Sequence, residues 1–283
     1  MKIFIVPDVH GSLAWKAAKD KADSVDKIVF LGDYFDSWEN QWPQQGQNFA
    51  EICEFKRSNP DKVVLLIGNH DWSYLSGTRD GENCSGHQHS RSKEIRGLLA
   101  QNKDIIDIAF EADGWVFSHA GFSKTWAGYM QDVLSENFSS DEWSISLLNK
   151  IWHERSHKPS DPNFCYGFDE LLDWHGVYSG CGDEVFQGCL WIRPSSLLED
   201  AFYPKQLVGH SEYCLEGYVC LKKNQNIAVI ADSREHTPFG IFDTENFDES
   251  RAMTELEFSR YYKKTLKRIN DEKARAGQTE TLQ

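Results

Sequence analysis

The chain has 283 residues, of which 40% are hydrophobic and 13% aromatic, and this composition excludes a disordered protein, which would carry fewer aromatic side chains. A formal net charge of -14 disfavours tight binding to long nucleic acid, because such binding depends on a basic surface. The seven cysteines, an odd number without a CxxC pair, favour reduced thiols and a cytoplasmic protein over a disulfide framework.

The first apolar run, Lys2–Val6, predicts a buried strand, and the loop after it carries Asp8 and His10. A helix is expected from about Leu13 to Ala22. The N-terminal run is too short for a secretory signal peptide, and no later stretch approaches the roughly 20 apolar residues that a membrane span needs. We therefore expect a protein without a membrane partner.

A second predicted strand, Lys27–Leu31, is followed by Asp33 and then by Asp36 on the loop that leaves it. An Asp after a Gly at a strand end is by itself a common turn device, so its meaning depends on the other strand ends. A polar, Trp-rich loop over Ser37–Gln47 follows, and a helix is expected from about Asn48 to Arg57.

The third predicted strand, Lys62–Ile67, ends in a motif that contains Asn69 and His70. Three successive units of strand, polar loop and helix predict an α/β sheet whose functional residues gather beyond the carboxyl ends of the strands. The segment Leu75–Gln88 is rich in small and polar residues, and we expect it to be irregular.

The chain continues with a predicted helix, Glu94–Asn102, and a predicted strand, Trp115–Ser118, that ends in His119. Residues from 122 to about 188 then change in character, with tryptophans set among helical periods. This pattern predicts a mostly helical insertion that covers the site.

Arg193 precedes a short predicted strand, Gln206–Val208, that ends in His210. Short apolar runs at 218–221, 227–231 and 240–242 then suggest an antiparallel meander. A long charged helix with a basic end is expected for residues 252–276, and a solvated helix packed along one edge is favoured over an interaction arm.

Polar fragments follow five of these strands, and their chemistry is that of a metal centre. They are Asp8-x-His10, Gly32-Asp33-x-x-Asp36, Gly68-Asn69-His70-Asp71, His119-Ala120-Gly121 and Gly209-His210. Two divalent ions about 3.5–4 Å apart need an anionic ligand between them, and Asp33 is the natural bridge. Carboxylate, imidazole and amide oxygen suit manganese, iron or zinc.

In this order, the five fragments resemble those of the calcineurin-like metallophosphoesterase superfamily, and most closely its bacterial and phage phosphoprotein phosphatase branch. The resemblance covers residues 1–245 and leaves a C-terminal helix and polar tail at 246–283. It implies an α/β fold, in which a two-sheet β-sandwich is flanked by helices and carries the helical insertion at about 122–188. It also implies two divalent metal ions, with Mn²⁺ favoured and Fe or Zn as alternatives.

The resemblance also implies a role for each site residue. The expected metal ligands are Asp8, His10 and Asp33 for the first ion, and Asp33, Asn69, His119 and His210 for the second. His70 would protonate the leaving group, Asp36 would hold the far nitrogen of His70, and Arg193 would clamp the phosphate. The branch usually has an Arg directly after the second Asp of its GDxxD motif, where this chain has Ser37.

The implied activity is hydrolysis of a phosphate ester by in-line attack of a hydroxide that bridges the metals. The substrate would be a phosphoprotein, a nucleotide or another small phosphate ester, and the sequence does not define the oligomeric state. A non-catalytic scaffold with the same fold is the first alternative, which the presence of Asp36 and His70 disfavours. End-processing of nucleic acid is the second alternative, which the net charge disfavours.

Overall fold

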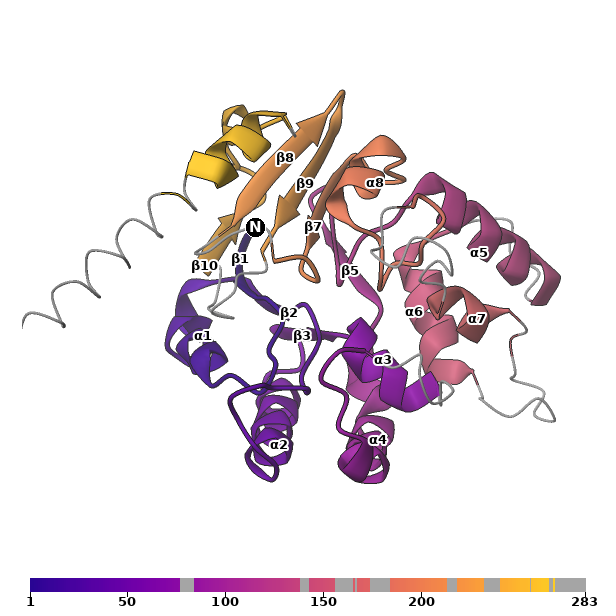
Figure 1. Ribbon diagram of the computed structural model, residues 1–283. Helices are drawn as coiled ribbons and strands as arrows, with labels where there is room; N and C mark the ends of the chain where they lie inside the picture. The colour runs from indigo at the N-terminus through magenta and orange to yellow at the C-terminus, as the bar shows by residue number, and fades with distance from the viewer. Residues whose placement is uncertain are drawn as a thin grey trace, which may run out of the picture.

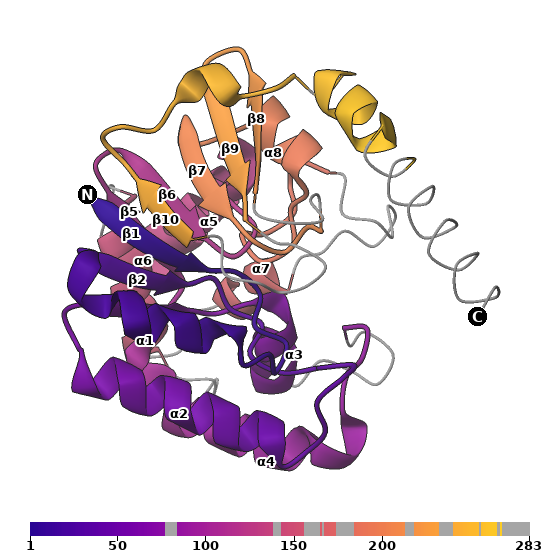
Figure 2. The same cartoon turned by 90° about the vertical axis from the view of Figure 1, so that its left-hand side faces the viewer.

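The chain folds into two β-sheets packed face to face, with helices on the outside of both (Figures 1 and 2). The computed structural model describes residues 1–76, 84–137, 143–155, 165, 167–173, 184–212, 218–231, 240–254, 256–264 and 267. No helix within these ranges is both long enough and apolar enough to span a bilayer.

The first sheet has the strand order β10-β1-β2-β3-β4. Its strands are β1 (Lys2–Val6), β2 (Lys27–Phe30), β3 (Val63–Leu66), β4 (Ile106–Asp107) and β10 (Gly240–Asp243). Strands β1 to β4 are parallel, and β10 is antiparallel to β1 at the edge. The α/β sheet predicted for the first part of the chain is confirmed, although β4 was not anticipated.

The second sheet has the order β5-β6-β7-β9-β8. Its strands are β5 (Ala109–Ala112), β6 (Trp115–Ser118), β7 (Lys205–Val208), β8 (Val219–Lys223) and β9 (Asn226–Ile230). The central strands β6, β7 and β9 are parallel, whereas β5 and β8 are antiparallel to their neighbours. The fold therefore places two parallel strand sets opposite each other.

The prediction of an antiparallel meander after β7 was wrong. Only β8 and β9 form a hairpin; β9 is parallel to β7, and β10 joins the first sheet. The position of β10 follows from tertiary packing, because Phe242 is 1% exposed between the sheets, with its ring 4.8 Å from that of Trp115. The sequence of so short a strand does not determine which sheet edge the strand joins.

Alternation along the strands builds the core between the sheets. Ile3 and Ile5 pack with Phe117 and Val229 of the second sheet, and these residues are fully buried. The intervening Phe4 points to the opposite face and packs with the helices. The predicted two-sheet sandwich with outer helices is therefore confirmed.

Helices cover the outer face of the first sheet. They are α1 (Ala17–Lys21), α2 (Gln44–Ser58), α3 (Asn69–Ser76) and α4 (Ser92–Gln101). Phe49 and Ile52 of α2 and Ile95 of α4 are fully buried in this layer. Helix α2 begins four residues earlier than expected, and the helix expected at about 13–22 is divided into short 3-10 and α segments. The 3-10 segments of the fold are Ala14–Lys16, Ala22–Ser24, His89–Arg91, Lys103–Ile105 and Glu249–Arg251.

The predicted insertion contributes α5 (Lys124–Asn137), α6 (Ile145–Glu154) and α7 (Phe168–Leu172). Helix α6 attaches it to the sheet edges, because the Trp152 indole N–H donates to the carbonyl of Ile106 at 2.7 Å. Residues 138–142, 156–164, 166 and 174–183 of the insertion lie outside the described residues.

A short helix, α8 (Pro194–Glu199), covers the outer face of the second sheet, where Leu197 packs with Ile230. The beginning of the predicted C-terminal helix is helical at 256–264, and Phe258 packs at the margin of the same apolar cluster. Residues 268–283, which include Arg268, Lys273 and Arg275 of its basic end, lie outside the described residues.

Candidate metal centre

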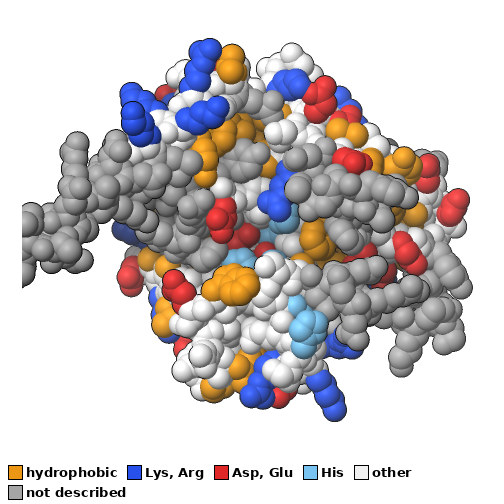
Figure 3. All heavy atoms as spheres, in the orientation of Figure 1, with side chains coloured by type: hydrophobic (Ala, Val, Ile, Leu, Met, Phe, Trp, Pro, Cys, Tyr) orange, Lys and Arg blue, Asp and Glu red, His pale blue; other side chains and the backbone are white. Residues whose placement is uncertain are grey.

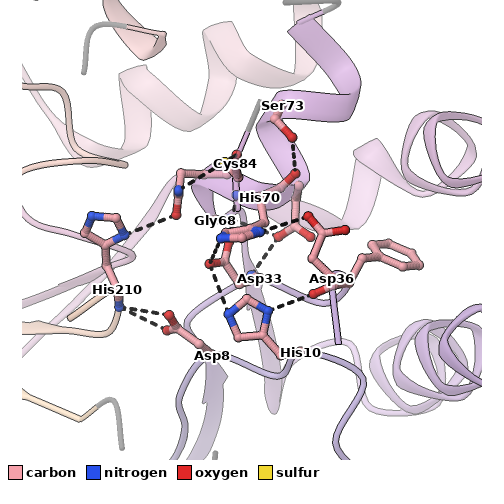
Figure 4. A network of polar contacts seen from close by, with 12 residues as sticks. Asp8, His10, Asp33, Asp36, Gly68, His70, Ser73, Cys84 and His210 are labelled. Carbon is pink, nitrogen blue, oxygen red and sulfur yellow. Dashed lines mark hydrogen bonds and ion pairs between the residues drawn. The ribbon is translucent and has the colours of Figure 1, made fainter. Parts of the chain in front are cut away.

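The predicted site residues meet at one end of the sandwich, where parallel strands of both sheets finish (Figure 4). The residues follow β1 (Asp8, His10), β2 (Asp33, Asp36), β3 (Asn69, His70), β6 (His119) and β7 (His210). Residues separated by up to 202 positions in the chain thus touch directly, as Asp8 and His210 do. This is the crevice where parallel sheets place their functional residues.

Unusual backbone angles aim several of these side chains. His10, Asp33, Asp36 and His210 have φ values of 41°, 51°, 64° and 61°. This left-handed region is sparsely used by residues other than glycine and costs about 1–3 kcal/mol where the surroundings impose it. The loops after β1 and β2 stay hydrogen-bonded to each other beyond the strands, since the His10 amide donates to the Asp33 carbonyl at 2.7 Å. This pairing holds the residues in the left-handed region.

Two glycines allow the loops after β2 and β3 to touch. A Cβ on Gly32 would lie 2.4 Å from the amide nitrogen of Gly68, and Gly32 has a φ of 107°. A Cβ on Gly68 would lie 2.0 Å from Oδ1 of Asp33. Neither position accepts a side chain without moving a strand end, so Asp33 is set against the third strand.

Asp71 holds the loops after β2 and β3 together by accepting backbone hydrogen bonds from both. No role was predicted for it from the sequence. Its carboxylate accepts the amide hydrogens of Asp33 at 2.8 Å, Tyr34 at 2.9 Å and Gly68 at 3.0 Å. Burial raises the pKa of Asp71 to about 7, against the lowering effect of these three donors. Its place in the first turn of α3 after the Gly-Asn-His motif was the available signal.

Three histidines are each anchored to a backbone carbonyl by one ring nitrogen. Nδ1 of His10 lies 2.8 Å from the Phe35 carbonyl, and Nδ1 of His119 lies 2.8 Å from the Leu31 carbonyl. Nε2 of His210 lies 3.0 Å from the Trp191 carbonyl. Because a carbonyl only accepts, each anchoring nitrogen carries the proton, and the other nitrogen presents a lone pair, which is the arrangement of metal-ligating histidines.

The lone pairs of two histidines converge on the side-chain oxygen of Asn69. Its Oδ1 lies 2.7 Å from Nε2 of His119 and 3.1 Å from Nδ1 of His210. Burial lowers the pKa of His119 to about 3 and that of His210 well below 6.5, so both rings are neutral near pH 7. With Oδ1 of Asn69 turned toward the two rings, three acceptors face one another, and this donor set fits a divalent metal ion.

The orientation of the Asn69 amide is set by Cys84. The amide nitrogen of Asn69 donates to the Cys84 sulfur at 3.3 Å, which turns Oδ1 toward the histidines. Burial raises the pKa of the Cys84 thiol, so the thiol stays protonated. Cys84 lies in the segment Leu75–Gln88, which the sequence predicted to be polar and irregular.

Asp33 lies at the centre of the cluster. Its Oδ2 is 3.7 Å from Nε2 of His10, 3.6 Å from Nε2 of His119 and 3.9 Å from Nε2 of His70. Two overlapping groups of potential ligand atoms share this carboxylate, one with His10 and His70 and one with Asp8 and His119. Asp33 is therefore positioned to be shared between two ions.

The electrostatics of the cluster also call for positive charge. Asp33 and Asp8 are 1% and 3% exposed. Burial, and then the neighbouring carboxylates of Asp8 and Asp71, raise the pKa of Asp33 well above 3.8. Buried like charges of this kind are stabilised by coordinated metal ions.

His70 differs from the anchored histidines because a carboxylate, rather than a carbonyl, holds it. Its Nδ1 lies 2.8 Å from Oδ2 of Asp36, and the backbone amide of His70 donates to Asp33 Oδ1 at 2.9 Å. The Asp36–His70 pairing expected from the sequence is thus present in the structure. The other side of the ring faces Asp33, with Nε2 of His70 3.9 Å from Oδ2.

A residue missed by the sequence interpretation, Tyr74, supports this pair. The Tyr74 hydroxyl donates to the second oxygen of Asp36 and accepts the amide hydrogen of Gln88 at 2.8 Å. Tyr74 lies one turn after His70 on α3, a helix that the sequence interpretation did not include. A recognised helix here would have placed both side chains on one face.

Arg193 lies beside His210 at the start of α8. Its Nη1 donates to the His210 carbonyl at 3.1 Å and to the Ser211 hydroxyl at 3.2 Å. The positive charge of Arg193 contributes to the lowered pKa values of His119 and His210, as expected of a close neighbour. The structure thus places Arg193 at the rim of the cluster, and its phosphate contact remains a prediction.

The sequence profile of the calcineurin-like phosphoesterases matches residues 1–211 of the chain. No curated protein is significantly similar to it in sequence.

Among solved structures, the chain is similar to a cold-active protein-tyrosine phosphatase from the psychrophile Shewanella sp. The two share 17% identity at a TM-score of 0.50, over 83% of this chain and 72% of the other. A protein serine/threonine phosphatase from Saccharomyces cerevisiae, with similarity to human phosphatase PP5, is 14% identical at a TM-score of 0.44, over 82% and 67%. The Shewanella likeness concerns the fold, and it agrees with the observed two-sheet architecture.

Proposed function

This chain belongs to the calcineurin-like phosphoesterase family, and from that premise we propose that it is a phosphatase that hydrolyses a phosphate ester at a dinuclear metal centre. Divalent metal ions are general in that family. We propose Mn²⁺ as the native ion, with Fe or Zn as alternatives, because the ligands are carboxylate, imidazole and amide oxygen. The proposed ligands are Asp8, His10, Asp33, Asn69, His119 and His210.

One observation carries the proposal. Oδ1 of Asn69 lies 2.7 Å from Nε2 of His119 and 3.1 Å from Nδ1 of His210, while the Asn69 amide nitrogen donates to Cys84. In this amide orientation three acceptors face one another, and a divalent cation satisfies all three. Asp33, shared by two potential ligand groups, supports a second ion beside the first.

When bound, the two ions would activate a water molecule for in-line attack and neutralise charge on the phosphate. His70 would donate a proton to the leaving oxygen from Nε2, while Asp36 holds Nδ1 at 2.8 Å and stabilises the imidazolium. Arg193 would hold a phosphate oxygen with the guanidinium nitrogens that His210 and Ser211 do not occupy.

The substrate is a phosphorylated molecule of a kind to be determined by assay. A phosphoprotein, a nucleotide and a small phosphate ester are all compatible with the exposed rim of the site. The Shewanella and yeast relatives act on phosphoproteins by name, so phosphotyrosine, phosphoserine and phosphothreonine peptides belong in the assay. A 5′-phosphorylated oligonucleotide tests end-processing, which the net charge of -14 disfavours.

The test begins with chelated protein, to which manganese, iron or zinc is returned before assay with p-nitrophenyl phosphate and the substrates above. We expect hydrolysis only after metal is returned, with two ions bound per chain by elemental analysis. Activity that survives complete chelation contradicts the proposal. Two bound ions without turnover of any substrate would instead indicate a non-catalytic scaffold.

A further inference from the structure

The most exposed tryptophan of the described residues lies on the loop that carries Asp36, the carboxylate that holds the proposed proton donor. Trp38 is 78% exposed, whereas Trp15, Trp72 and Trp126 are no more than 1% exposed. It follows Asp36, the partner of His70, by two residues. Single apolar residues on a surface usually need no explanation, so the case depends on where this indole lies and how it is held.

The indole of Trp38 lies against Gly86. A Cβ on Gly86 would be 3.2 Å from Cζ2 of Trp38 and 3.5 Å from the carbonyl oxygen of Asp36. The ring and the backbone of Asp36 therefore border the same Cα, and the carboxylate of the same Asp36 lies 2.8 Å from Nδ1 of His70. In Figure 3, hydrophobic side chains adjoin the hollow in which histidine and acidic side chains are visible.

The loop that carries the indole is braced on several sides. The Ser37 hydroxyl accepts the amide hydrogen of Asn40 at 2.9 Å, and the Asn40 side chain donates to the Gly11 carbonyl at 3.1 Å. Oε1 of Gln45 accepts the Ser37 amide at 3.3 Å and the Gln88 side chain at 3.0 Å. A surface that is already ordered loses little conformational entropy when a ligand binds.

The loop has Ser37 where similar phosphatases have an arginine. Its hydroxyl is used to cap the turn, so the position that holds an Arg in similar phosphatases offers no charge to a substrate. The next residue instead presents a broad aromatic face to solvent. Position 38 therefore offers an aromatic face to a ligand at this part of the loop.

We propose that Trp38 is a stacking platform for an aromatic ring in the leaving group of the substrate. This inference rests on the proposed function, because only the role of His70 as proton donor makes its side of the site the leaving-group side. The ligand class is a phosphate ester whose leaving group carries a planar ring, such as a tyrosyl side chain or a nucleoside. Stacking of two rings is typically worth about 2- to 12-fold in affinity.

Binding and turnover are measured separately on the manganese-loaded protein. The binding probes are phenylphosphonate and methylphosphonate, which differ only in the ring, and their dissociation constants are obtained by calorimetry. The turnover probes are phosphotyrosine and adenosine monophosphate, which carry rings, and phosphoserine and glycerol phosphate, which do not. Comparing each variant with wild type on the same ester removes the intrinsic reactivity of the leaving group.

We expect Trp38→Ala to weaken phenylphosphonate binding and to lower kcat/KM on ring-bearing esters by about 2- to 12-fold. Methylphosphonate and the ring-free esters should stay within about 2-fold, since they make no stacking contact. Trp38→Phe should recover most of the loss. Tyr261→Ala, at a tyrosine that is 52% exposed on the C-terminal helical segment, is the matched control and should change nothing.

The stacking proposal would be wrong if Trp38→Ala affected ring-bearing and ring-free ligands equally, or if it affected neither. Ring-selective binding that depends on Trp38, in a protein that hydrolyses none of the esters, would support the platform while refuting the proposed function. A loss confined to phosphotyrosine identifies a tyrosyl ring, and one confined to adenosine monophosphate identifies a nucleobase.

Discussion

The two sheets contribute different chemistry to the same centre. The acidic half, formed by the loops after β1, β2 and β3, supplies the carboxylates and the Asp36–His70 pair. The imidazole half, formed by the ends of β6 and β7, supplies His119 and His210, whose rings burial keeps neutral. The halves are tied together, because His119 is anchored on the Leu31 carbonyl after β2 and Asp8 accepts the His210 amide. The carboxylates thus come from the first sheet together with His10 and Asn69, whereas the second sheet contributes the neutral rings of His119 and His210.

The largest effect is expected from removing the charge of Asp33, the carboxylate that both potential ligand groups share. Asp33→Asn keeps the size of the side chain but removes its anionic bridge. We expect kcat/KM for p-nitrophenyl phosphate to fall by about 10⁴-fold or more, since the metal ions supply several kcal/mol of transition-state stabilisation. Metal content should fall in parallel, by elemental analysis.

The matched control is Asp20→Asn, at an exposed carboxylate on α1, which should retain activity and metal. Full activity of Asp33→Asn would place the metal centre elsewhere.

His70→Asn tests whether the acidic half separates metal binding from proton transfer. The variant should keep both ions and lose about 10²–10³-fold in rate on esters with poor leaving groups, within the range of a positioned general acid. The loss should be small on p-nitrophenyl phosphate, whose leaving group needs no proton. Loss of metal from this variant would make His70 a ligand, as one of the two potential ligand groups permits.

His119→Gln tests the neutral character of the imidazole half through the pH dependence of stability. The pKa of His119 is lowered to about 3 in the folded state, so below about pH 6.5 the unfolded chain binds a proton that the folded chain does not. The contribution of His119 is therefore complete above pH 6.5 and is lost as the pH falls.

Urea unfolding of the chelated proteins measures this loss. The free energy of unfolding of wild type minus that of His119→Gln should decrease by about 1.4 kcal/mol per pH unit from pH 6 to pH 4. A difference that is independent of pH across this range would show that His119 titrates normally.

The smallest expected effect concerns the support of the proton donor. Tyr74→Phe removes the hydroxyl that donates to Asp36 and accepts the Gln88 amide. Since one hydrogen bond contributes about 0.5–1.5 kcal/mol, kcat on poor leaving groups should fall by about 2- to 12-fold. KM and metal content should stay near wild type, and Tyr261→Phe is the control. A change in KM alone would indicate contact with substrate instead of positioning.

The sequence predicted the acidic half more completely than the surroundings that hold it. Lys2–Val6 and Lys27–Phe30 are continuous apolar runs, as buried parallel strands require, so the strands and the residues beyond them could be recognised together. By contrast, β4 has two residues and α8 has six, too few for a periodic pattern. Their positions depend on packing partners far away in the chain.

Two of the residues missed at the site act through contacts that form only when the chain folds. Asp71 and Cys84 act through hydrogen bonds to Asp33, Gly68 and Asn69, which exist only after separate loops have come together. Such contacts correspond to no recognisable spacing of residues in the sequence. The fragments beyond the strands could be identified because each contains residue types typical of metal coordination within two to five positions.

The facing pair Gly32 and Gly68 has a consequence for how this site can vary over time. A Cβ on Gly32 would lie 2.4 Å from the amide nitrogen of Gly68, and a Cβ on Gly68 would lie 2.0 Å from Oδ1 of Asp33, the residue that follows Gly32. A single replacement at either position separates the two strand ends and moves Asp33, so no sequence of individually harmless changes leads away from the pair. We expect mutational scanning to find both positions intolerant even of alanine, and a redesigned centre of this type would need to keep both glycines before choosing any ligand.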